Sequence, residues 1–411
     1  MGEEVVAQRD ERAISMARGD VAPKNQIPKP MRRNELIFTN ATVVLADRVL
    51  KGTVLVRDGD IAAVDSGVSS LPAAIDCDGD LLLPGLVELH TDNIERHIEP
   101  RPGAIWPVES ATLNHDRELA GAGITTVFNA LCVGEVHSRS MRSSFLKEMM
   151  AALDHHLARN ALLVDHYLHW RCEVSYPGLK ELLDPLLDHP RLRLISVMDH
   201  TPGQRQFVDR AKYAEYYQGK FNMTGAELEA FMQSRTRDAA EFSETNRRYV
   251  VSSARARDVR LASHDDATLA HVEEALADGV AIAEFPTTME AARACREAGL
   301  SVLMGGPNLV RGQSHSGNVS ALALAALGLL DIVSSDYVPC SLLWGALKLH
   351  TEAGIALHAA IATVTLNPAR AVGFEDRGKI EAGRRADLVR VKALDGAPLI
   401  REVWREGNRV A

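Results

Sequence analysis

The feature that most constrains the fold is a series of eight short apolar segments that alternate with helical patterns. Helical patterns fill the intervals, for example at Met141–Ala158, Leu269–Ala277, Met289–Ala298 and Ser320–Leu330. The eight strand candidates are Leu82–Asp92, Ile124–Ala130, Leu162–Glu173, Leu192–His200, Arg260–His264, Val280–Phe285, Ser301–Met304 and Leu330–Asp336. Eight strands with helical crossovers favour an α/β fold, a parallel (β/α)₈ barrel. A doubly wound sheet is the alternative, but it needs a glycine-rich phosphate turn that does not follow the first strand.

Both ends of the chain have a different pattern, which predicts a second, smaller body. Short alternating runs at Glu35–Ala46 and Thr53–Val64 indicate antiparallel strands, and similar runs return near Ala386–Val391 and Glu402–Trp404. We therefore expect residues 34–81 and 373–411 to form one β lobe, with the barrel at 82–372 inserted into it. Residues 1–33 contain no aromatic residue and no apolar region typical of a signal peptide, so we expect a disordered extension.

Composition excludes several classes of partner. The formal net charge of −9 disfavours a broad nucleic-acid footprint, so we expect no nucleic-acid partner. The longest weakly polar run, Val319–Leu330, is shorter than the roughly 20 residues of a membrane span, and it indicates a buried helix. Five scattered cysteines without a CxxC pair predict reduced thiols and a cytoplasmic protein. Homo-oligomerisation is left open.

One connection, residues 204–259, is longer than a barrel crossover needs. It contains Tyr213, Tyr216, Tyr217 and Phe221, and Thr224-Gly225-Ala226-Glu227 fits a capping box that begins a helix through Met232. Loops of this size over a barrel mouth are often lids, and a peripheral helical hairpin is the alternative.

Acidic residues and histidines gather at the carboxyl ends of five strand candidates. Side chains alternate along a strand, so His90 and Asp92 share one face, and His169, Arg171 and Glu173 share another. Like charges crowded at one rim require a cation. We expect one or two divalent ions, zinc first with manganese or iron as alternatives, held by His90, Asp92, Glu173, His200, His264 and Asp336.

Several segments resemble the amidohydrolase superfamily. They are Leu83–His90, Thr365–Ala369, Gly378-Lys379-Ile380 and Gly383–Leu388. The resemblance implies a metal-dependent (β/α)₈ barrel inserted into a β-sandwich lobe. This chain departs from the usual pattern, since Asp92 replaces the second histidine of His-x-His. No lysine that could be carboxylated ends a strand, and Glu173 is the available substitute.

Longer motifs resemble one branch of that superfamily, the triphosphate diphosphatases of the carbon–phosphorus lyase pathway of phosphonate metabolism. The motifs are His90–His97, Ser263–Thr268, Glu284–Thr288, Gly305–Asn308 and Ser314–Asn318. The resemblance implies hydrolysis of a phosphorylated sugar, a ribose 5-triphosphate phosphonate, to the 5-phosphate and pyrophosphate. It also implies that Asp336 accepts the proton of the attacking water; the alternative is that Asp336 is only a ligand or salt-bridge partner.

A polyphosphate needs local positive charge, because the whole chain is acidic. The candidates lie beside the predicted strand ends: Arg96, His97, Arg101, Arg171, Arg311 and His315.

Two other function classes stay open. One is a metallohydrolase that acts on a cyclic amide or an amino-purine or amino-pyrimidine, and the other is a non-catalytic relative.

Overall fold

Two sheets organise the chain, one near its ends and one in its middle. The computed structural model describes residues 35–134, 145–205, 213–214, 217–219, 222–314, 317–392 and 397–411. The predicted extension, residues 1–33, lies outside the described residues, as do Tyr216, Phe221 and His315.

The middle sheet is the predicted parallel barrel. Its eight strands follow the chain order from β6 to β13, and every neighbouring pair is parallel. They are β6 (Leu86–Thr91), β7 (Ile124–Val133), β8 (Asp165–Glu173), β9 (Leu192–Met198), β10 (Arg260–His264), β11 (Ile282–Glu284), β12 (Ser301–Gly305) and β13 (Ile332–Ser334). A parallel bridge between Thr91 and Asp336 joins the last strand to the first. This arrangement confirms the predicted fold class.

The segment expected as one strand, Leu82–Asp92, is two strands in two sheets. β5 (Leu81–Pro84) pairs with strands of the lobe, and β6 begins the barrel after Gly85. A Cβ at Gly85 would lie 2.2 Å from Oγ1 of Thr125 and 2.8 Å from Cβ of Asp387. Only glycine lets the chain pass this closely between lobe and barrel, so the expectation of one continuous strand was wrong.

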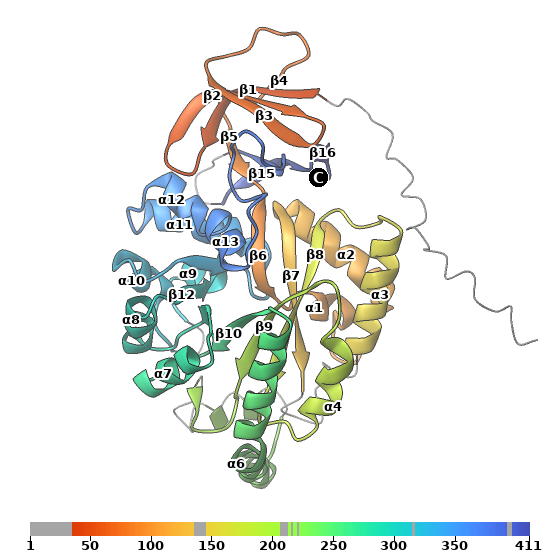
Figure 1. Cartoon of the computed structure of the whole chain (residues 1–411), viewed down its shortest axis with the longest axis vertical. Helices are drawn as coiled ribbons and strands as arrows, with labels where there is room; N and C mark the ends of the chain where they lie inside the picture. The colour runs from red at the N-terminus through yellow and green to blue at the C-terminus, as the bar shows by residue number, and fades with distance from the viewer. Residues whose placement is uncertain are drawn as a thin grey trace, which may run out of the picture. The chain divides into compact units, whose positions relative to one another are not determined.

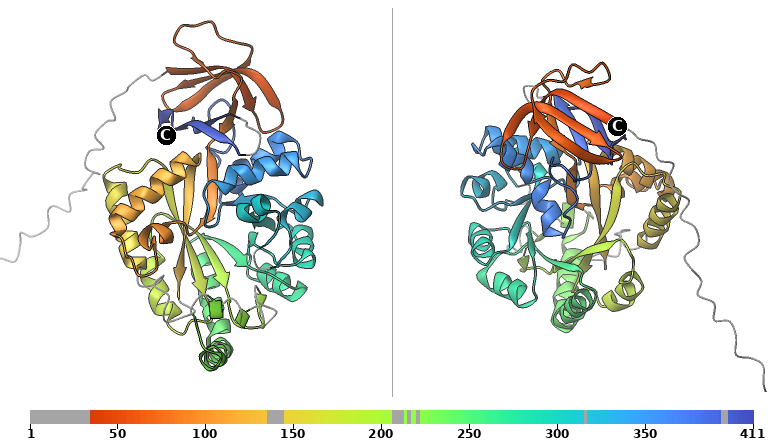
Figure 2. Two further views of the ribbon diagram at one scale, coloured as in Figure 1. Left: turned by 180° about the vertical axis from the view of Figure 1, so that it is seen from behind. Right: turned by 45° about the horizontal axis from the view of Figure 1, so that its top comes forward.

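The lobe is built from both ends of the chain. Its strand order is β16-β15-β14-β5-β1-β2-β3, with β4 paired to β1, so strands from the two termini lie side by side (Figures 1 and 2). They are β1 (Glu35–Val44), β2 (Val49–Arg57), β3 (Asp60–Ser66), β4 (Ile75–Asp76), β14 (Leu388–Lys392), β15 (Leu399–Arg405) and β16 (Asn408–Arg409). A bridge between Asp60 and Arg385 curls this sheet around a core that includes Phe38, Val54 and Trp404.

Helices flank the barrel strands on their outer side (Figure 1). They are α1 (Ile94–Ile98), α2 (Val108–Gly121), α3 (Leu146–Ala158), α4 (Leu179–Leu183), the 3₁₀ turn η1 (Asp184–Leu186), α6 (Gly225–Ala256), α7 (Leu269–Ala277), α8 (Met289–Glu297), α9 (Gly306–Arg311), α10 (Ala321–Ala326), α11 (Ser341–Thr351), α12 (Leu357–Ala362) and α13 (Leu366–Ala371). None of those in the described ranges is long and apolar enough to cross a membrane.

The capping box before α6 is confirmed, but the predicted end of this helix at Met232 is wrong. The Thr224 side chain accepts from the amide of Glu227, and the Glu227 carboxylate accepts from the amide of Thr224. The helix continues to Ala256 because no glycine or proline interrupts it after Gly225. Its last turns bury Val250 and Ala254 in the barrel core, as a crossover helix does. Whether its first turns serve as a lid stays a prediction.

Candidate metal centre and active site

Two groups of possible metal ligands lie at the carboxyl ends of the barrel strands. The first consists of His90, His169 and Glu284, and the second of His200, His264 and Asp265. In each group, one nitrogen or oxygen atom of every residue lies within 4.8 Å of the others. Strands β6, β9, β10 and β11 supply five of these residues at or just beyond their carboxyl ends, and His169 lies within β8, four residues before its end. The barrel therefore brings together side chains that are up to 194 positions apart in sequence.

Glu284 is at the centre of the two groups. Its Oε1 accepts from Nδ1 of His90 at 3.0 Å, and its Oε2 accepts from Nδ1 of His264 at 3.2 Å and from the Ser196 hydroxyl at 2.7 Å. Although burial opposes ionisation, the neighbouring His90 and His169 hold the pKa of Glu284 well below its usual range. One fully buried carboxylate thus contacts histidines from three strands.

Hydrogen bonds to carboxylates fix which ring nitrogen of three of these histidines is free to bind an ion. A carboxylate can only accept, so Nδ1 of His90, His200 and His264 carries the proton in each pair, and Nε2 keeps its lone pair. Nδ1 of His169 lies 2.9 Å from the carbonyl oxygen of Leu89, and its Nε2 contacts the Ser196 hydroxyl. Metal-binding histidines characteristically donate their second nitrogen to a carboxylate or a carbonyl. The donor set therefore fits a divalent ion with nitrogen and oxygen ligands.

Burial keeps these rings neutral, which metal binding requires. It lowers the pKa of His169 to about 4, against the opposing charge of Glu284. It also lowers the pKa of His264 well below the usual range, although Glu284 again acts in the other direction. A protonated imidazole has no lone pair for a metal, so both rings are held in the form that can bind one.

Glu173 and Asp92, both predicted as ligands, lie beside these groups rather than within them. Oε2 of Glu173 accepts from Nδ1 of His200 at 2.6 Å, and Oε1 accepts from the Ser175 hydroxyl at 2.5 Å. Asp92 lies 3.5 Å from Nη1 of Arg171, a guanidinium that is 8% exposed. Glu173 is therefore one hydrogen bond away from the second group, and Asp92 is paired with a buried cation.

Asp336 follows the last barrel strand and lies next to the first. Its amide donates to the carbonyl oxygen of His90 at 3.1 Å, and its own carbonyl oxygen accepts from the Thr91 hydroxyl at 2.7 Å. Burial, followed by the neighbouring Asp92 carboxylate, raises the pKa of Asp336 to about 7. A carboxyl group with a pKa near neutrality is suited to exchange a proton with water at physiological pH.

Backbone strain also gathers at this rim. Asp265, Phe285 and Asp336 each follow a strand end and have φ values of 57°, 53° and 54°, in the left-handed region. Such a conformation costs on the order of 1–3 kcal/mol for a residue other than glycine, and it is unusual for a bulky side chain such as Phe285. The Phe285 ring packs edge-on against His90 and His264, with centroids 4.9 and 5.4 Å away. The strained position thus places an apolar wall against two candidate ligands.

The predicted phosphate-binding residues are dispersed. Arg96 and His97 both turn to Glu118 on α2, and Nε2 of His97 lies 2.7 Å from Oε2 of that carboxylate. Burial opposes ionisation of Glu118, but hydrogen bonds from His97, Asn93 and Arg96 lower its pKa to about 2. Arg101 and Arg311 are exposed. Of the five that the structure describes, Arg171 alone is buried beside the candidate ligands, and His315 lies outside the described residues.

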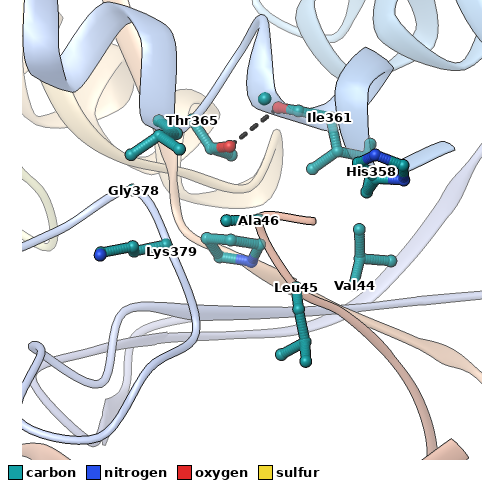
Figure 3. A pocket seen from close by; sticks show the side chains of 11 residues that line it. Val44, Leu45, Ala46, His358, Ile361, Thr365, Gly378 and Lys379 are labelled. Carbon is teal, nitrogen blue, oxygen red and sulfur yellow. Dashed lines mark hydrogen bonds between the residues drawn. The ribbon is translucent and has the colours of Figure 1, made fainter. Parts of the chain in front are cut away.

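A separate small pocket lies between lobe and barrel (Figure 3). Val44, Pro84, His358 and Lys379 are among its lining residues. Pro84 precedes the first barrel strand, whereas His90 is near the end of that strand, about 20 Å away at the usual rise per residue. This pocket is therefore remote from the metal-ligand groups.

Three members of the two groups were not predicted as ligands: His169, Glu284 and Asp265. His169 shares the face of Arg171 and Glu173, and Asp265 directly follows His264, so both were visible as neighbours of chosen residues. Glu284 offered a different signal, a single charged residue within the otherwise apolar run Val280–Phe285. A carboxylate buried in such a run needs hydrogen-bond or charge partners. The partners of Glu284 come from other strands, and spacing along the sequence does not identify them.

Comparisons with known proteins agree with this fold. The model of the amidohydrolase family matches residues 236–410. The α-D-ribose 1-methylphosphonate 5-triphosphate diphosphatase of Escherichia coli (strain K12) is 46% identical over 377 residues, which cover 91% of this chain and 100% of the relative.

Solved structures support the fold alone, because their sequence identities are low. N-isopropylammelide isopropylaminohydrolase from Burkholderia multivorans superposes with a TM-score of 0.59 at 18% identity, covering 91% of this chain and 97% of the other. N-acetyl-D-glucosamine-6-phosphate deacetylase from Mycobacterium smegmatis gives 0.58 at 15% identity, covering 92% and 99%.

Proposed function

We propose a function from the premise that this chain belongs to the amidohydrolase family, and that it is a hydrolase acting on a triphosphate. The proposed reaction is hydrolysis of α-D-ribose 1-methylphosphonate 5-triphosphate to the 5-phosphate and pyrophosphate, in phosphonate catabolism. The observation that carries this proposal is the 46% identity to a diphosphatase of that substrate, over 91% of the chain. The barrel rim described above supplies the groups that such a reaction needs.

The amidohydrolase family is metal-dependent, and we propose that the two ligand groups hold one or two divalent ions, zinc first. A bound ion lowers the pKa of water and neutralises phosphate charge. His200 and His264 would present Nε2 beside an oxygen of Asp265, and His90 and His169 would each present a ring nitrogen beside an oxygen of Glu284. Glu173, through its bond to Nδ1 of His200, keeps that ring directed at its group.

We assign the proton transfer to Asp336. It lies at the junction of the first and last strands, and its pKa of about 7 lets it accept a proton near neutral pH. Its position in the left-handed region points to a functional constraint, since strain of this kind persists mainly where the surrounding structure imposes it. The proposed role is to orient the attacking water and to take its proton.

We propose that the phosphate chain is held by Arg171 closest to the ligand groups and by Arg96, His97, Arg101, Arg311 and His315 farther out. Arg171 is the best supported because it is buried beside the ligand groups and a guanidinium can donate two parallel hydrogen bonds to a phosphate, although Asp92 lies 3.5 Å from it. Arg96 and His97 are paired with Glu118, so a phosphate would have to compete with that carboxylate for them.

A product analysis tests the proposal. The metal-reconstituted protein is incubated with the ribose 1-methylphosphonate 5-triphosphate, and phosphorus NMR follows the products; an ordinary nucleoside triphosphate and a cyclic amide serve as comparison substrates. We expect the 5-phosphate and pyrophosphate, and no turnover after a chelator removes the metal. Hydrolytic ring opening of the comparison amide without triphosphate cleavage would instead identify another metallohydrolase, and a metal-binding protein without turnover would identify a non-catalytic relative.

Cytoplasmic location, the absence of a nucleic-acid partner and the oligomeric state stay predictions. All five cysteines are free thiols in the structure, and four of them are buried. The acidic net charge of −9 supports the expectation that no nucleic acid binds broadly to this chain.

A further inference from the structure

Five buried polar side chains form a continuous hydrogen-bonded series behind the first barrel strands. The series, which we call the relay, consists of Asn93, His115, Asn129, His166 and Asp116. Each of these residues is at most 2% exposed. They come from the turn after β6, from helix α2 and from strands β7 and β8. The proposed mechanism uses none of them.

Asp116 lies at one end of the relay and determines which atom donates in each of its hydrogen bonds. This carboxylate accepts from the amides of Leu163 and Val164, at 2.9 and 3.1 Å. Nε2 of His166 lies 3.1 Å from Oδ1 of Asp116. A carboxylate can only accept, so Nε2 of His166 carries the proton of this bond.

The donor and acceptor roles of Asn129 are fixed because a backbone carbonyl holds its side-chain amide in one orientation. Its Nδ2 reaches both Nδ1 of His166 and the carbonyl oxygen of Tyr167, each at 3.1 Å. Turning the amide over would place its oxygen against that carbonyl oxygen. Nδ1 of His166 is therefore an acceptor, and Oδ1 of Asn129 faces His115.

The last two bonds follow from the same rule. Oδ1 of Asn129 lies 3.1 Å from Nε2 of His115, which must carry the proton, so Nδ1 of His115 accepts from Nδ2 of Asn93 at 3.1 Å. Burial, with the neighbouring His166, lowers the pKa of His115 to about 3, so this ring has one proton and one lone pair. The second hydrogen of Nδ2 in Asn93 goes to Oε2 of Glu118 at 2.9 Å.

Asn93 connects the relay to the candidate active site. It directly follows Asp92 and precedes α1. Its backbone N–H donates to the Thr91 hydroxyl oxygen at 3.3 Å, and that hydroxyl donates to the carbonyl oxygen of Asp336. Through Glu118 it is also joined to His97. We infer that the relay positions Asn93, and with it the turn that carries Asp92 and α1, by presenting one acceptor, Nδ1 of His115, to the Asn93 side chain.

The direction of the relay is tested by nitrogen NMR of the wild-type protein with ¹⁵N-labelled histidine. The structure requires both His115 and His166 to be neutral, with the proton on Nε2 and none on Nδ1. His115→Asn and His166→Gln spectra assign the two signals by their disappearance. If either ring is protonated at Nδ1 in the wild type, the inferred direction is wrong, and this outcome does not depend on any enzymatic assay.

The positioning role is tested by two variants of nearly equal size, His115→Asn and His115→Leu. Asparagine can present Oδ1 where Nδ1 of histidine was, whereas leucine offers no acceptor to Asn93. We expect His115→Leu to lower kcat/KM for the triphosphate by on the order of tenfold to a hundredfold, as misplaced catalytic geometry does. His115→Asn should stay within about threefold of the wild type, because a modest displacement of the acceptor leaves the bond in place.

Thermal unfolding of both variants shows that the assayed protein is folded. Asn408→Asp, which removes a side-chain bond to the Glu406 carbonyl oxygen on the lobe surface, is the control and should leave kcat/KM unchanged. Equal losses in the two His115 variants, or no loss in either, would contradict the positioning role. The kinetic part rests on the proposed function: a wild-type protein that does not cleave the triphosphate would overturn that function, while the NMR result would still decide the relay.

Discussion

Among single residues, Asp336 contrasts with Glu284 because its acidity is weakened rather than strengthened. Glu284 is surrounded by histidines that keep it ionised, whereas Asp336 is buried and faces the like charge of Asp92. Two carboxylates with opposite shifts in pKa suit different tasks. Glu284 stays ionised, whereas Asp336 can exchange a proton. This contrast supports Asp336 as the base and Glu284 as the fixed partner of the ligand histidines.

Replacing Asp336 by asparagine therefore tests its role. We expect Asp336→Asn to lower kcat by on the order of 10²-fold or more, the usual effect of losing a general base, with metal content unchanged. Elemental analysis of the same samples that are assayed separates the two effects. Loss of metal in parallel with activity would assign Asp336 to the ligand set instead.

The ligand role of His264 gives a second test at this scale. Its ring is buried and fixed by Glu284, so His264→Asn removes an oriented nitrogen donor. We expect the affinity for a divalent metal to fall at least tenfold, the order seen when metal-site partners are lost, as measured by competition with a chromogenic chelator. His350→Asn, at an exposed histidine on α11, is the matched control. Equal metal affinity in both variants would make His264 a structural residue.

At the scale of elements, the barrel and the lobe meet at Asp165, the first residue of β8. Three guanidiniums from the carboxyl-terminal part of the chain surround it: Arg385 at 2.7 Å, Arg377 at 3.1 Å and Arg405 at 3.3 Å. Burial opposes ionisation of Asp165, but Arg385, Arg405 and Arg377 together hold its pKa below the usual value. This carboxylate thus links the β8 end of the barrel to the strands of the lobe.

Asp165→Asn should lower the free energy of unfolding by about 2–4 kcal/mol near pH 7, because it leaves three partly buried cations without their shared partner. The native pKa of Asp165 is lower than that of the unfolded chain, which is about 4. Its stabilising contribution is therefore complete above about pH 4 and is lost as the pH falls through the native value. Urea unfolding at neutral and acid pH should show the difference shrinking in acid, and a constant difference would refute this account. The exposed Asp154→Asn serves as the control.

The sequence predicts elements better than it predicts how they end. The eight barrel strands were placed correctly because apolar runs separated by helical periodicity leave few alternatives. The division at Gly85 was missed because apolar residues continue on both sides of it, and its cause is a steric contact with Thr125 and Asp387 from distant parts of the chain. The true end of α6 was missed because no local signal marks the predicted one.

The same limit holds for the site. Histidines and acids at strand ends could be chosen from side-chain alternation, and His90, His200 and His264 do lie in the two ligand groups. Glu284 could not be ranked above other buried positions, since its importance comes from partners on β6, β9 and β10. Pairings across a barrel depend on strand register, which spacing along the chain does not determine.

For the whole molecule, the lobe, the barrel and the rim together support attack of water on a triphosphate at its innermost phosphorus. The acidic chain provides positive charge only locally, with Arg171 buried next to the ligand groups and Arg96 and Arg311 farther out. This distribution suits a substrate whose inner phosphate lies at the rim and whose outer phosphates extend away from it. The position of bond cleavage is thus the central claim.

Hydrolysis in oxygen-18 water tests this claim most directly. The metal-reconstituted protein is given the ribose 1-methylphosphonate 5-triphosphate, and mass spectrometry with phosphorus NMR locates the label. Attack at the inner phosphorus places oxygen-18 on the sugar 5-phosphate and leaves pyrophosphate unlabelled. Label in pyrophosphate, or orthophosphate as the main product, would contradict the account.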